Sequence, residues 1–496
     1  MEYHRPVSIH PENPRYFFFR GQPRALVCAT EHYGSVINRR FDFERYLDDA
    51  ADKRQTLTRL FLLFRGNQDP LLRIPYSSLM PDPQDYVAPW VRTGPGKTAD
   101  GELRFDLDRW NDEYFERLRR FMTLASQRSI IVEASLFSNP YSDYLWALHP
   151  LCASSNINGV GDLRWYEYTT LREPALVERQ QSFVRRVAHE LNDFDNFYYE
   201  ICNEPGGAAE HVTPTEVDAW QETIAATLYA EEAKLPHQHL VAGTNAFQDF
   251  LKRPIEHDLS MSFANPIFHV ANYHPGVGST YRGQVHAVGE FMSGELKAAE
   301  LRGLCLATAA EPKPFVVDED NSASIYVDDT GWTIHRKRAW TTVLSGGHYD
   351  YIDFSIVPGH EAGTEESRQK IRTWMRNLSA FIHAFDFVHA RPDTSWLQAD
   401  LPHVVVSGLA VPGSQYVAYI ADGREREDPG AGTPLSGAVA LTLPAGVYLV
   451  SLYSPVAGQE SPGVAVEGGQ SATLALPPFV HDVVVVVRRR AGASDH

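Results

Sequence analysis

The chain has 496 residues, of which 43% are hydrophobic and 22% are charged, values that are ordinary for a globular protein with a large core. Its 45 basic and 63 acidic residues give a formal net charge of −18. This acidic balance argues against nucleic acid and against an anionic membrane surface as partners. The sequence has no apolar stretch long enough to span a membrane, and it leaves the formation of a homo-oligomer open.

The cysteines are few and far apart in the sequence, at Cys28, Cys152, Cys202 and Cys305. No CxxC or Cys/His spacing indicates zinc, and no motif indicates another metal or an organic cofactor. The N-terminus lacks the basic segment and the apolar core of a secretory signal. We therefore expect reduced thiols and a cytoplasmic protein that needs no cofactor.

Apolar runs alternate with segments of helical periodicity through the first 385 residues. The predicted strands lie at 24–30, 57–64, 129–136, 196–201, 239–243, 267–272, 315–318 and 349–353, and the predicted helices at 43–52, 109–128, 171–191, 215–233, 332–344 and 369–385. A long loop is expected between residues 64 and 105. Eight strands separated by helices predict an α/β fold, the (β/α)8 TIM barrel. A doubly wound open sheet is the alternative, but the turn at 29–33 lacks the glycines expected there.

The pattern changes after Pro392, where helical periodicity disappears. Short β-rich runs separated by Gly, Pro and Asp turns follow at 403–406, 416–420, 438–443, 448–453, 472–476 and 483–487. Such spacing predicts a small all-β sandwich of about 100 residues. We therefore expect a barrel domain at residues 1–388 and a C-terminal β-sandwich domain at residues 389–490.

Two of the predicted barrel strands end at acidic residues. The apolar run 197–201 leads into Asn203-Glu204-Pro205, and the proline ends the strand because it cannot donate to the ladder. The run 313–319 ends at Glu319 in the same way. Barrels keep their chemistry at this end of the strands. Two carboxyl groups on either side of a glycosidic bond can cleave it, because one protonates the leaving oxygen and the other attacks or activates water.

These two motifs, Asn-Glu-Pro after the fourth strand and Pro-x-x-x-x-Glu on the seventh, resemble glycoside hydrolase clan A over about residues 15–385. The resemblance implies a retaining enzyme with Glu204 as acid/base and Glu319 as nucleophile, acting on a carbohydrate substrate. It also implies that Asn203 binds the sugar 2-hydroxyl.

The resemblance extends to two other strand ends. Arg59 on the second strand is similar to the arginine that holds the nucleophile, and Tyr273 or His274 is similar to the residue that contacts it. We expect Glu204 to stay protonated through burial and a negative neighbour, and Arg59 to lower the pKa of Glu319. The two carboxyl groups should lie about 5–5.5 Å apart, the retaining separation.

The sequence departs from the clan at Asp318-Glu319-Asp320, where clan members often have Glu-Phe-Gly after the nucleophile. Side chains alternate along a strand, so Asp318 and Asp320 are expected to point away from Glu319. The spacing from Pro314 favours Glu319 as the nucleophile, and the two aspartates remain alternatives.

Four further residues are candidate substrate contacts. Glu31 and His32 follow the first strand, Glu133 lies within the third, and His348 flanks the eighth. A buried acid such as Glu133 needs a partner, which is either a sugar hydroxyl or Arg59.

In its overall layout the chain resembles apiosidase-like barrels that carry a C-terminal β-sandwich of the collagen-binding type. The matching segments are 340–347, 415–420 and 443–448. We interpret the sandwich as a packing domain. The long loops after the second and third strands favour a pocket and exo-action on a short oligosaccharide or glycoside. A non-catalytic carbohydrate-binding barrel and a transglycosylase with the same carboxylate pair are the alternatives.

Overall fold

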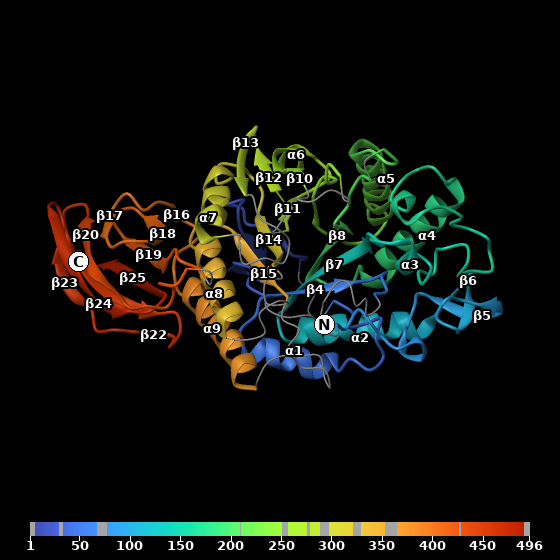
Figure 1. Cartoon of the computed structure of the whole chain (residues 1–496), viewed down its shortest axis with the longest axis horizontal. Helices are drawn as coiled ribbons and strands as arrows, with labels where there is room; N and C mark the ends of the chain where they lie inside the picture. Colours follow the sequence, from blue (N-terminus) through green and yellow to red (C-terminus); the bar gives the residue numbers. More distant parts are fainter. Residues whose placement is uncertain are drawn as a thin grey trace.

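The computed structural model describes residues 5–28, 33–66, 77–208, 210–249, 256–274, 278–287, 297–320, 329–352, 365–425 and 428–490. An α/β barrel and an all-β region lie side by side along the long axis of the molecule (Figure 1). Glu31 and His32, two of the candidate substrate contacts, lie outside the described residues.

The centre of the barrel is a seven-stranded parallel sheet in the order β15-β14-β11-β9-β8-β7-β4. Its strands are β4 (Leu57–Phe61), β7 (Ile131–Ser138), β8 (Phe197–Asn203), β9 (Val241–Gly243), β11 (Val270–Tyr273), β14 (Phe315–Asp320) and β15 (His348–Tyr351). Every side chain of β4, β7 and β8 is buried, which explains why these strands read as continuous apolar runs in the sequence.

The first predicted strand closes the barrel between β15 and β4. The Tyr349 N–H donates to Leu26 O and the Cys28 N–H donates to Tyr349 O, both at 3.1 Å. On the other side, the Thr56 N–H donates to Val27 O at 3.0 Å. This segment forms a single parallel bridge instead of a full strand, so the barrel is nearly closed. The predicted TIM barrel followed by a β-sandwich is confirmed.

The helices cover the outside of the barrel. They are α1 (Phe43–Asp52), α2 (Asp112–Gln127), α3 (Asp143–Trp146), α4 (Pro174–Leu191), α5 (Pro214–Glu232), α6 (Leu259–Ala264), α7 (Ala298–Ala307), α8 (Asp329–Val343) and α9 (Glu365–His383), with 3-10 turns at Pro83–Asp85 and Trp165–Glu167. At the start of α5, Thr213 and Glu216 form a reciprocal capping box with Pro214 at the first helical position. Within the described part of the chain, none of the helices combines the length and hydrophobicity needed to cross a membrane.

The loop expected between residues 64 and 105 instead contains a β-hairpin, β5 (Trp90–Lys97) and β6 (Leu103–Trp110). The sequence hid it because Gly94, Pro95 and Gly96 interrupt the first of the two strands. Its ends are joined by Trp90 and Trp110, whose rings stack with centroids 5.5 Å apart. A second small sheet outside the barrel consists of β10 (Glu256–Asp258), β12 (Gly278–Tyr281) and β13 (Gln284–Ala287).

The N-terminal end of the barrel is closed by an antiparallel sheet of β1 (Ser8–Ile9), β2 (Phe17–Phe19) and β3 (Gln22–Arg24). Phe17 and Phe19 pack against the first residues of the barrel strands, in one apolar cluster with Leu57, Ile131 and Val316. The four cysteines are buried, and none of them forms a disulfide.

The C-terminal region is a sandwich of two antiparallel sheets. The larger consists of β16 (Arg391–Pro392), β18 (Val404–Val411), β19 (Gln415–Asp422), β25 (Asp482–Arg489), β21 (Val447–Ser454), β22 (Gln459–Glu460) and β23 (Val464–Glu467); the smaller consists of β17 (Leu397–Asp400), β20 (Leu435–Thr442) and β24 (Ser471–Phe479). Apolar side chains of both sheets, among them Val439, Leu441 and Val485, form a common core.

Helices α8 and α9 lie between the barrel sheet and the sandwich (Figure 1). Trp340 of α8 stacks on Tyr419 with ring centroids 5.6 Å apart, and Arg336 Nε lies 2.7 Å from Asp482 Oδ2.

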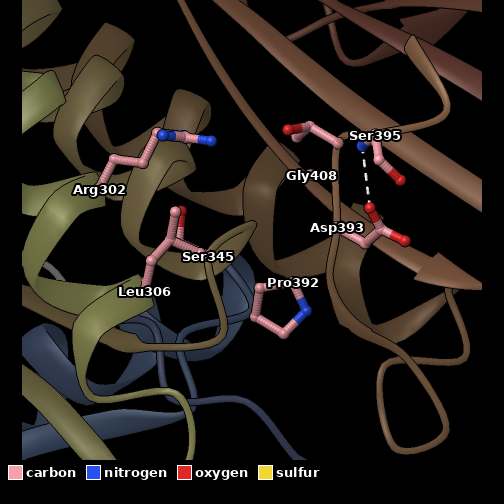
Figure 2. Close-up of a pocket in the computed structure, with 8 residues that line it drawn as sticks. Arg302, Leu306, Ser345, Pro392, Asp393, Ser395 and Gly408 are labelled. Atoms are coloured by element: carbon pink, nitrogen blue, oxygen red, sulfur yellow. Dashed lines mark hydrogen bonds between the residues drawn. The ribbon is translucent and has the colours of Figure 1, made fainter.

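A cavity of about 310 Å³ lies at the same boundary between the barrel and the sandwich. It is lined by Arg302, Leu306, Ser345, Pro392, Asp393, Thr394, Ser395 and Gly408, with Arg302 and Asp393 on opposite sides (Figure 2). Ser345 comes just before β15, so this cavity is at the N-terminal end of the barrel strands, opposite to the end at which Glu204 and Glu319 lie.

Candidate active site

Arg59, in the middle of β4, is the centre of the site and is fully buried. Its guanidinium contacts five side chains from three other strands. Nε lies 3.3 Å from both Glu133 Oε1 and Asp318 Oδ2. Nη1 lies 2.5 Å from Glu319 Oε2, and Nη2 lies 2.6 Å from Glu200 Oε2 and 2.9 Å from Asn203 Oδ1. One arginine therefore connects the inner faces of β7, β8 and β14. The five planar N–H donors of a guanidinium suit such a set of acceptors.

Burial disfavours the ionised form of two acids near Arg59. It raises the pKa of Glu133 and of Asp350, which lies in β15, well above the usual values. Glu133 also accepts hydrogen bonds from Tyr198 Oη at 2.6 Å and from Asn272 Nδ2 at 2.8 Å. These raised pKa values limit the negative charge that Arg59 has to balance, since buried unpaired charges are costly.

Glu204 follows the last residue of β8 and has a left-handed backbone, with φ 49°. Its Oε1 lies 3.2 Å from His274 Nδ1, and it accepts a hydrogen bond from the Tyr141 hydroxyl. Burial opposes ionisation, but the contacts with His274 and Tyr141 hold the pKa of Glu204 below its usual value. Glu204 is thus an ionised carboxylate with two protein donors.

His274 joins Glu204 to the acids beneath it. Its Nε2 lies 3.4 Å from Asp318 Oδ2 while its Nδ1 faces Glu204. Burial favours the neutral ring, but Asp318 and Glu204 raise the pKa of His274 well above its usual value. The two acids therefore favour the protonated form of the ring, whose Nδ1 is hydrogen-bonded to Glu204.

Glu319 has a left-handed backbone as well, with φ 63°, and the pairing of β14 with β15 shifts register between Val317 and Asp320. As a result, Asp318 and Glu319 both reach Arg59. The expectation that Asp318 points away from Glu319 is wrong, because strict alternation fails at this irregularity. Asp320 does turn away, and its carboxylate binds Arg338 Nη1 at 2.7 Å.

Among the acids that the structure describes around Arg59, Glu204 and Glu319 reach the open end of the barrel. Their side chains are 8% and 13% exposed, whereas Asp318 is fully buried. A carboxylate oxygen of each and a ring nitrogen of His274 lie within 4.8 Å of one another. This group forms a compact site of two acids and one imidazole.

The pKa values of the two glutamates lie in the reverse of the expected order. Burial raises the pKa of Glu319 to about 7, although Arg59 and His274 oppose the shift. Glu204, expected to be the protonated partner, is the more acidic of the two because His274 and Tyr141 donate to it. At pH 7 Glu319 is therefore about half protonated while Glu204 is ionised, so the proton of the pair is held mainly by Glu319.

The side chains of this site come close enough together to hold a cation in two places. These are Glu204, His274 and Glu319, and beneath them Glu200, His274 and Asp318. His274 belongs to both sets, and its two nitrogens are directed at Glu204 and Asp318. Because a protonated imidazole has no lone pair for a metal, protonation of His274 would compete with a cation at either place.

Solved structures of similar shape span both parts of the chain. A family 5 glycoside hydrolase from Bacteroides vulgatus aligns with a TM-score of 0.62 at 11% identity, over 99% of this chain and 96% of its own. A second structure, described as a glycoside hydrolase, aligns with a TM-score of 0.60 at 12% identity, over 98% and 97%. The likeness is one of fold. No protein-family model matches the sequence, and no curated protein matches it.

Three of the predicted site residues surround the two glutamates. Arg59 contacts Glu319 and Asn203, as described above. His274 approaches Glu204 at 3.2 Å, whereas contact with Glu319 was expected. The alternative at that strand end, Tyr273, is excluded because its ring is buried in the layer between sheet and helices, stacked on Phe315 with centroids 5.9 Å apart.

Two predicted substrate contacts are wrong. Glu133 is fully buried beneath Arg59, so the ion-pair alternative is the one observed and the side chain does not reach the open end. His348 begins β15 and therefore lies at the N-terminal end of the barrel. There its Nδ1 accepts from the Leu26 N–H at 2.9 Å and its Nε2 faces Arg15 O at 2.8 Å. Burial lowers the pKa of His348 to about 3, as expected for a neutral structural ring.

Sequence reasoning missed three residues of the site: Tyr141, Glu200 and Asn272. Glu200 contacts Arg59, and Asn272 Nδ2 donates to Glu133 and lies 3.2 Å from Asp318 Oδ2. Both are polar residues inside apolar strand runs, and that signal could have identified them. Tyr141 lies in a loop three residues after β7, where no local pattern marks it.

Aromatic rings lie beside the carboxylates. Tyr33 stacks on Phe61 with centroids 4.9 Å apart, Phe61 meets Phe64 at 6.0 Å, and Phe64 meets Tyr141 at 5.9 Å. This aromatic row (Tyr33, Phe61, Phe64, Tyr141) also packs against Ile352. An apolar wall beside polar groups is typical of small-molecule sites.

Proposed function

We propose that the protein is a retaining glycoside hydrolase in which Glu204 is the acid/base and Glu319 the nucleophile. The observation that carries the proposal is the approach of a Glu204 oxygen to a Glu319 oxygen within 4.8 Å at the open end of the barrel. Retaining enzymes have carboxyl groups about 5–5.5 Å apart, whereas inverting enzymes need about 6.5–9.5 Å for a water molecule. Asp318 and Asp320 are less suitable nucleophiles because both are buried away from the opening.

The reaction follows from the proton that the pair shares. Glu319 must be ionised to attack the anomeric carbon, and Glu204 must carry the proton that goes to the leaving oxygen. Transfer of the proton from Glu319 to Glu204 creates this state without changing the charge of the pair. After the covalent glycosyl–Glu319 ester forms, Glu204 takes a proton from water, which attacks the same carbon and releases the sugar and the Glu319 carboxylate.

The substrate is a carbohydrate, and a short oligosaccharide or glycoside cleaved from its end suits the long segments that follow β4 and β7. These segments carry the β5–β6 hairpin and Tyr141. The ring of Tyr141, which is partly exposed at the end of the aromatic row, can pack against the C–H face of a sugar ring. Residues 1–388 would then be the catalytic domain and residues 389–490 a brace for it. The likeness to apiosidase-like barrels and the cytoplasmic location remain predictions from the sequence.

A screen of aryl glycosides of different sugars tests the proposal. Glu204→Gln and Glu319→Gln should each lower kcat at least about 100-fold, the range for loss of a general acid or a base, without loss of the folded state. Glu222→Gln on the exposed side of α5 is the matched control and should retain full activity. Proton NMR of the first-formed product should give the anomer of the substrate.

An inverted product would exclude Glu319 as a nucleophile, and near-normal activity of either variant would exclude that residue. Transfer of the glycosyl group to an added acceptor sugar in preference to water would favour a transglycosylase. Tight binding of a sugar without turnover of any aryl glycoside would favour a carbohydrate-binding barrel.

A further inference from the structure

Tyr141 is a residue of the site that no motif identifies. It follows Asn139 and Pro140 at the C-terminal end of β7, and its backbone is left-handed with φ 64°. A bulky side chain rarely adopts this conformation, and such strain persists where the surrounding structure imposes it. The ring is partly exposed and lies edge-on to Phe64 at the end of the aromatic row.

The Tyr141 hydroxyl interacts with the polar groups around Glu204. It accepts a hydrogen bond from Asn203 Nδ2 at 2.7 Å, lies 3.3 Å from Ser138 Oγ, and donates to the Glu204 carboxylate. A phenol has one hydrogen to donate, so the direction of this chain is fixed from Asn203 through Tyr141 to Glu204.

Asn203 is fully engaged in this arrangement. Its Oδ1 accepts from Arg59 at 2.9 Å, and the two hydrogens of Nδ2 go to Ser138 Oγ at 3.2 Å and to Tyr141. The residue is 1% exposed. A ligand hydroxyl can reach the amide of Asn203 only by replacing one of these partners, and Tyr141 is the one on the open side.

We infer that Tyr141 is a displaceable partner of the acid/base site: in the free protein its hydroxyl holds the position that a substrate hydroxyl takes on Asn203, and it leaves Glu204 when the glycoside binds. The inference rests on the proposed function. Ser138, the other acceptor of Asn203, lies within β7 and cannot move aside in the same way.

Displacement of Tyr141 has a chemical consequence. Glu204 loses one of its two donors and retains His274, so it becomes a better proton acceptor. The proton held by Glu319 then moves from Glu319 Oε to Glu204 Oε, across the gap of at most 4.8 Å. Substrate binding thereby produces the ionisation state that the reaction needs.

Tyr141→Phe separates this role from a structural one, with an aryl glycoside that the wild-type protein hydrolyses as substrate. The variant keeps the ring but removes the competing hydroxyl, so KM should fall roughly 3- to 10-fold, the value of one hydrogen bond, while kcat stays within about twofold. The acidic limb of kcat/KM reports the pKa at which the free carboxyl pair takes up its second proton, and this limb should move up by about one pH unit. The acidic limb of kcat should not move. Tyr144→Phe, three residues on and 54% exposed, is the matched control.

A rise in KM would mean that Tyr141 binds the substrate instead of yielding to it. An unchanged KM with a lower Tm would mean a structural role, and a parallel shift of the kcat and kcat/KM profiles would mean that Tyr141 stays on Glu204 in the complex. Each result overturns the inference and leaves the proposed function intact. Absence of turnover by the wild-type protein on every glycoside overturns the proposed function itself.

Discussion

The two ends of the barrel interior are formed by the same strands and differ completely in chemistry. At the N-terminal end, Leu57, Ile131 and Val316 meet Phe17 of β2 in an apolar cluster. Two residues further along the same strands, Arg59, Glu133 and Asp318 form a buried ionic group. Inward-facing positions recur every second residue. Two residues along each strand therefore separate an apolar layer that stabilises the fold from a charged layer that supports the site.

This difference indicates where the protein gives up stability for chemistry. Apolar burial is favourable without specific partners, whereas each buried charge depends on the one it faces. The same change in volume should therefore have different consequences at the two ends, which the following substitutions measure.

Arg59→Met should have the largest effect. It removes the guanidinium that contacts Glu133, Glu200, Asp318 and Glu319 and leaves ionised acids without a partner in the core. We expect a loss of about 3–5 kcal/mol in the free energy of unfolding, measured by urea titration, together with loss of activity. Arg39→Met, which breaks an exposed pair with Glu113, is the control and should cost less than about 1 kcal/mol. Equal effects of the two variants would mean that the buried charges find other partners.

Phe17→Ala should be nearly as destabilising, at about 3–5 kcal/mol, because it opens a cavity under the strands. Its ring stacks on Tyr198 with centroids 5.6 Å apart. In contrast to Arg59→Met, the folded variant should keep its kcat. Phe18→Ala, on the partly exposed side of β2, is the control and should cost much less. A change in kcat with Phe17→Ala would show that the two layers are not independent.

The smallest effects concern pH and have opposite signs at the two ends. The pKa of Glu319, raised to about 7 by burial, lies above its unfolded value, so its contribution is present at low pH and is lost as the pH rises through about 7. The pKa of His348, lowered to about 3 by burial, lies below its unfolded value, so its contribution is present above about pH 6.5 and is lost as the pH falls.

Glu319→Gln should therefore gain stability relative to wild type between pH 5 and 8, and His348→Gln should show a weaker loss of stability below pH 6. The slopes should differ from wild type by at most about 1.4 kcal/mol per pH unit, measured by urea titration at each pH. Parallel curves for either variant and wild type would mean that the group ionises alike in the folded and unfolded states.

The sequence was sufficient for the order of the elements because strand and helix patterns are local. It failed where the pattern was broken: Gly94 and Pro95 hid a strand, and Gly303 weakened the helical signal of α7. It also placed His348 at the wrong end, although a residue before a barrel strand cannot lie at the catalytic end.

For the site, motifs were sufficient where the backbone is regular. Arg59 and Asn203 could be placed because each lies within a strand. Asp318 was misplaced because the left-handed Glu319 shifts the register, and Tyr141 was missed because its position depends on another left-handed residue in a loop. Both depend on tertiary contacts that a sequence pattern does not contain.

The seam between α8 and the sandwich has a consequence for how the molecule unfolds. Arg336 and Trp340 have their partners, Asp482 and Tyr419, on the sandwich, and the core that contains Trp340 continues into both parts. Separating the two parts would break the Arg336–Asp482 ion pair and expose the Trp340 ring to water. Neither part is therefore expected to unfold while the other stays folded. The barrel and the sandwich should therefore denature as a single cooperative unit, with one transition in calorimetry.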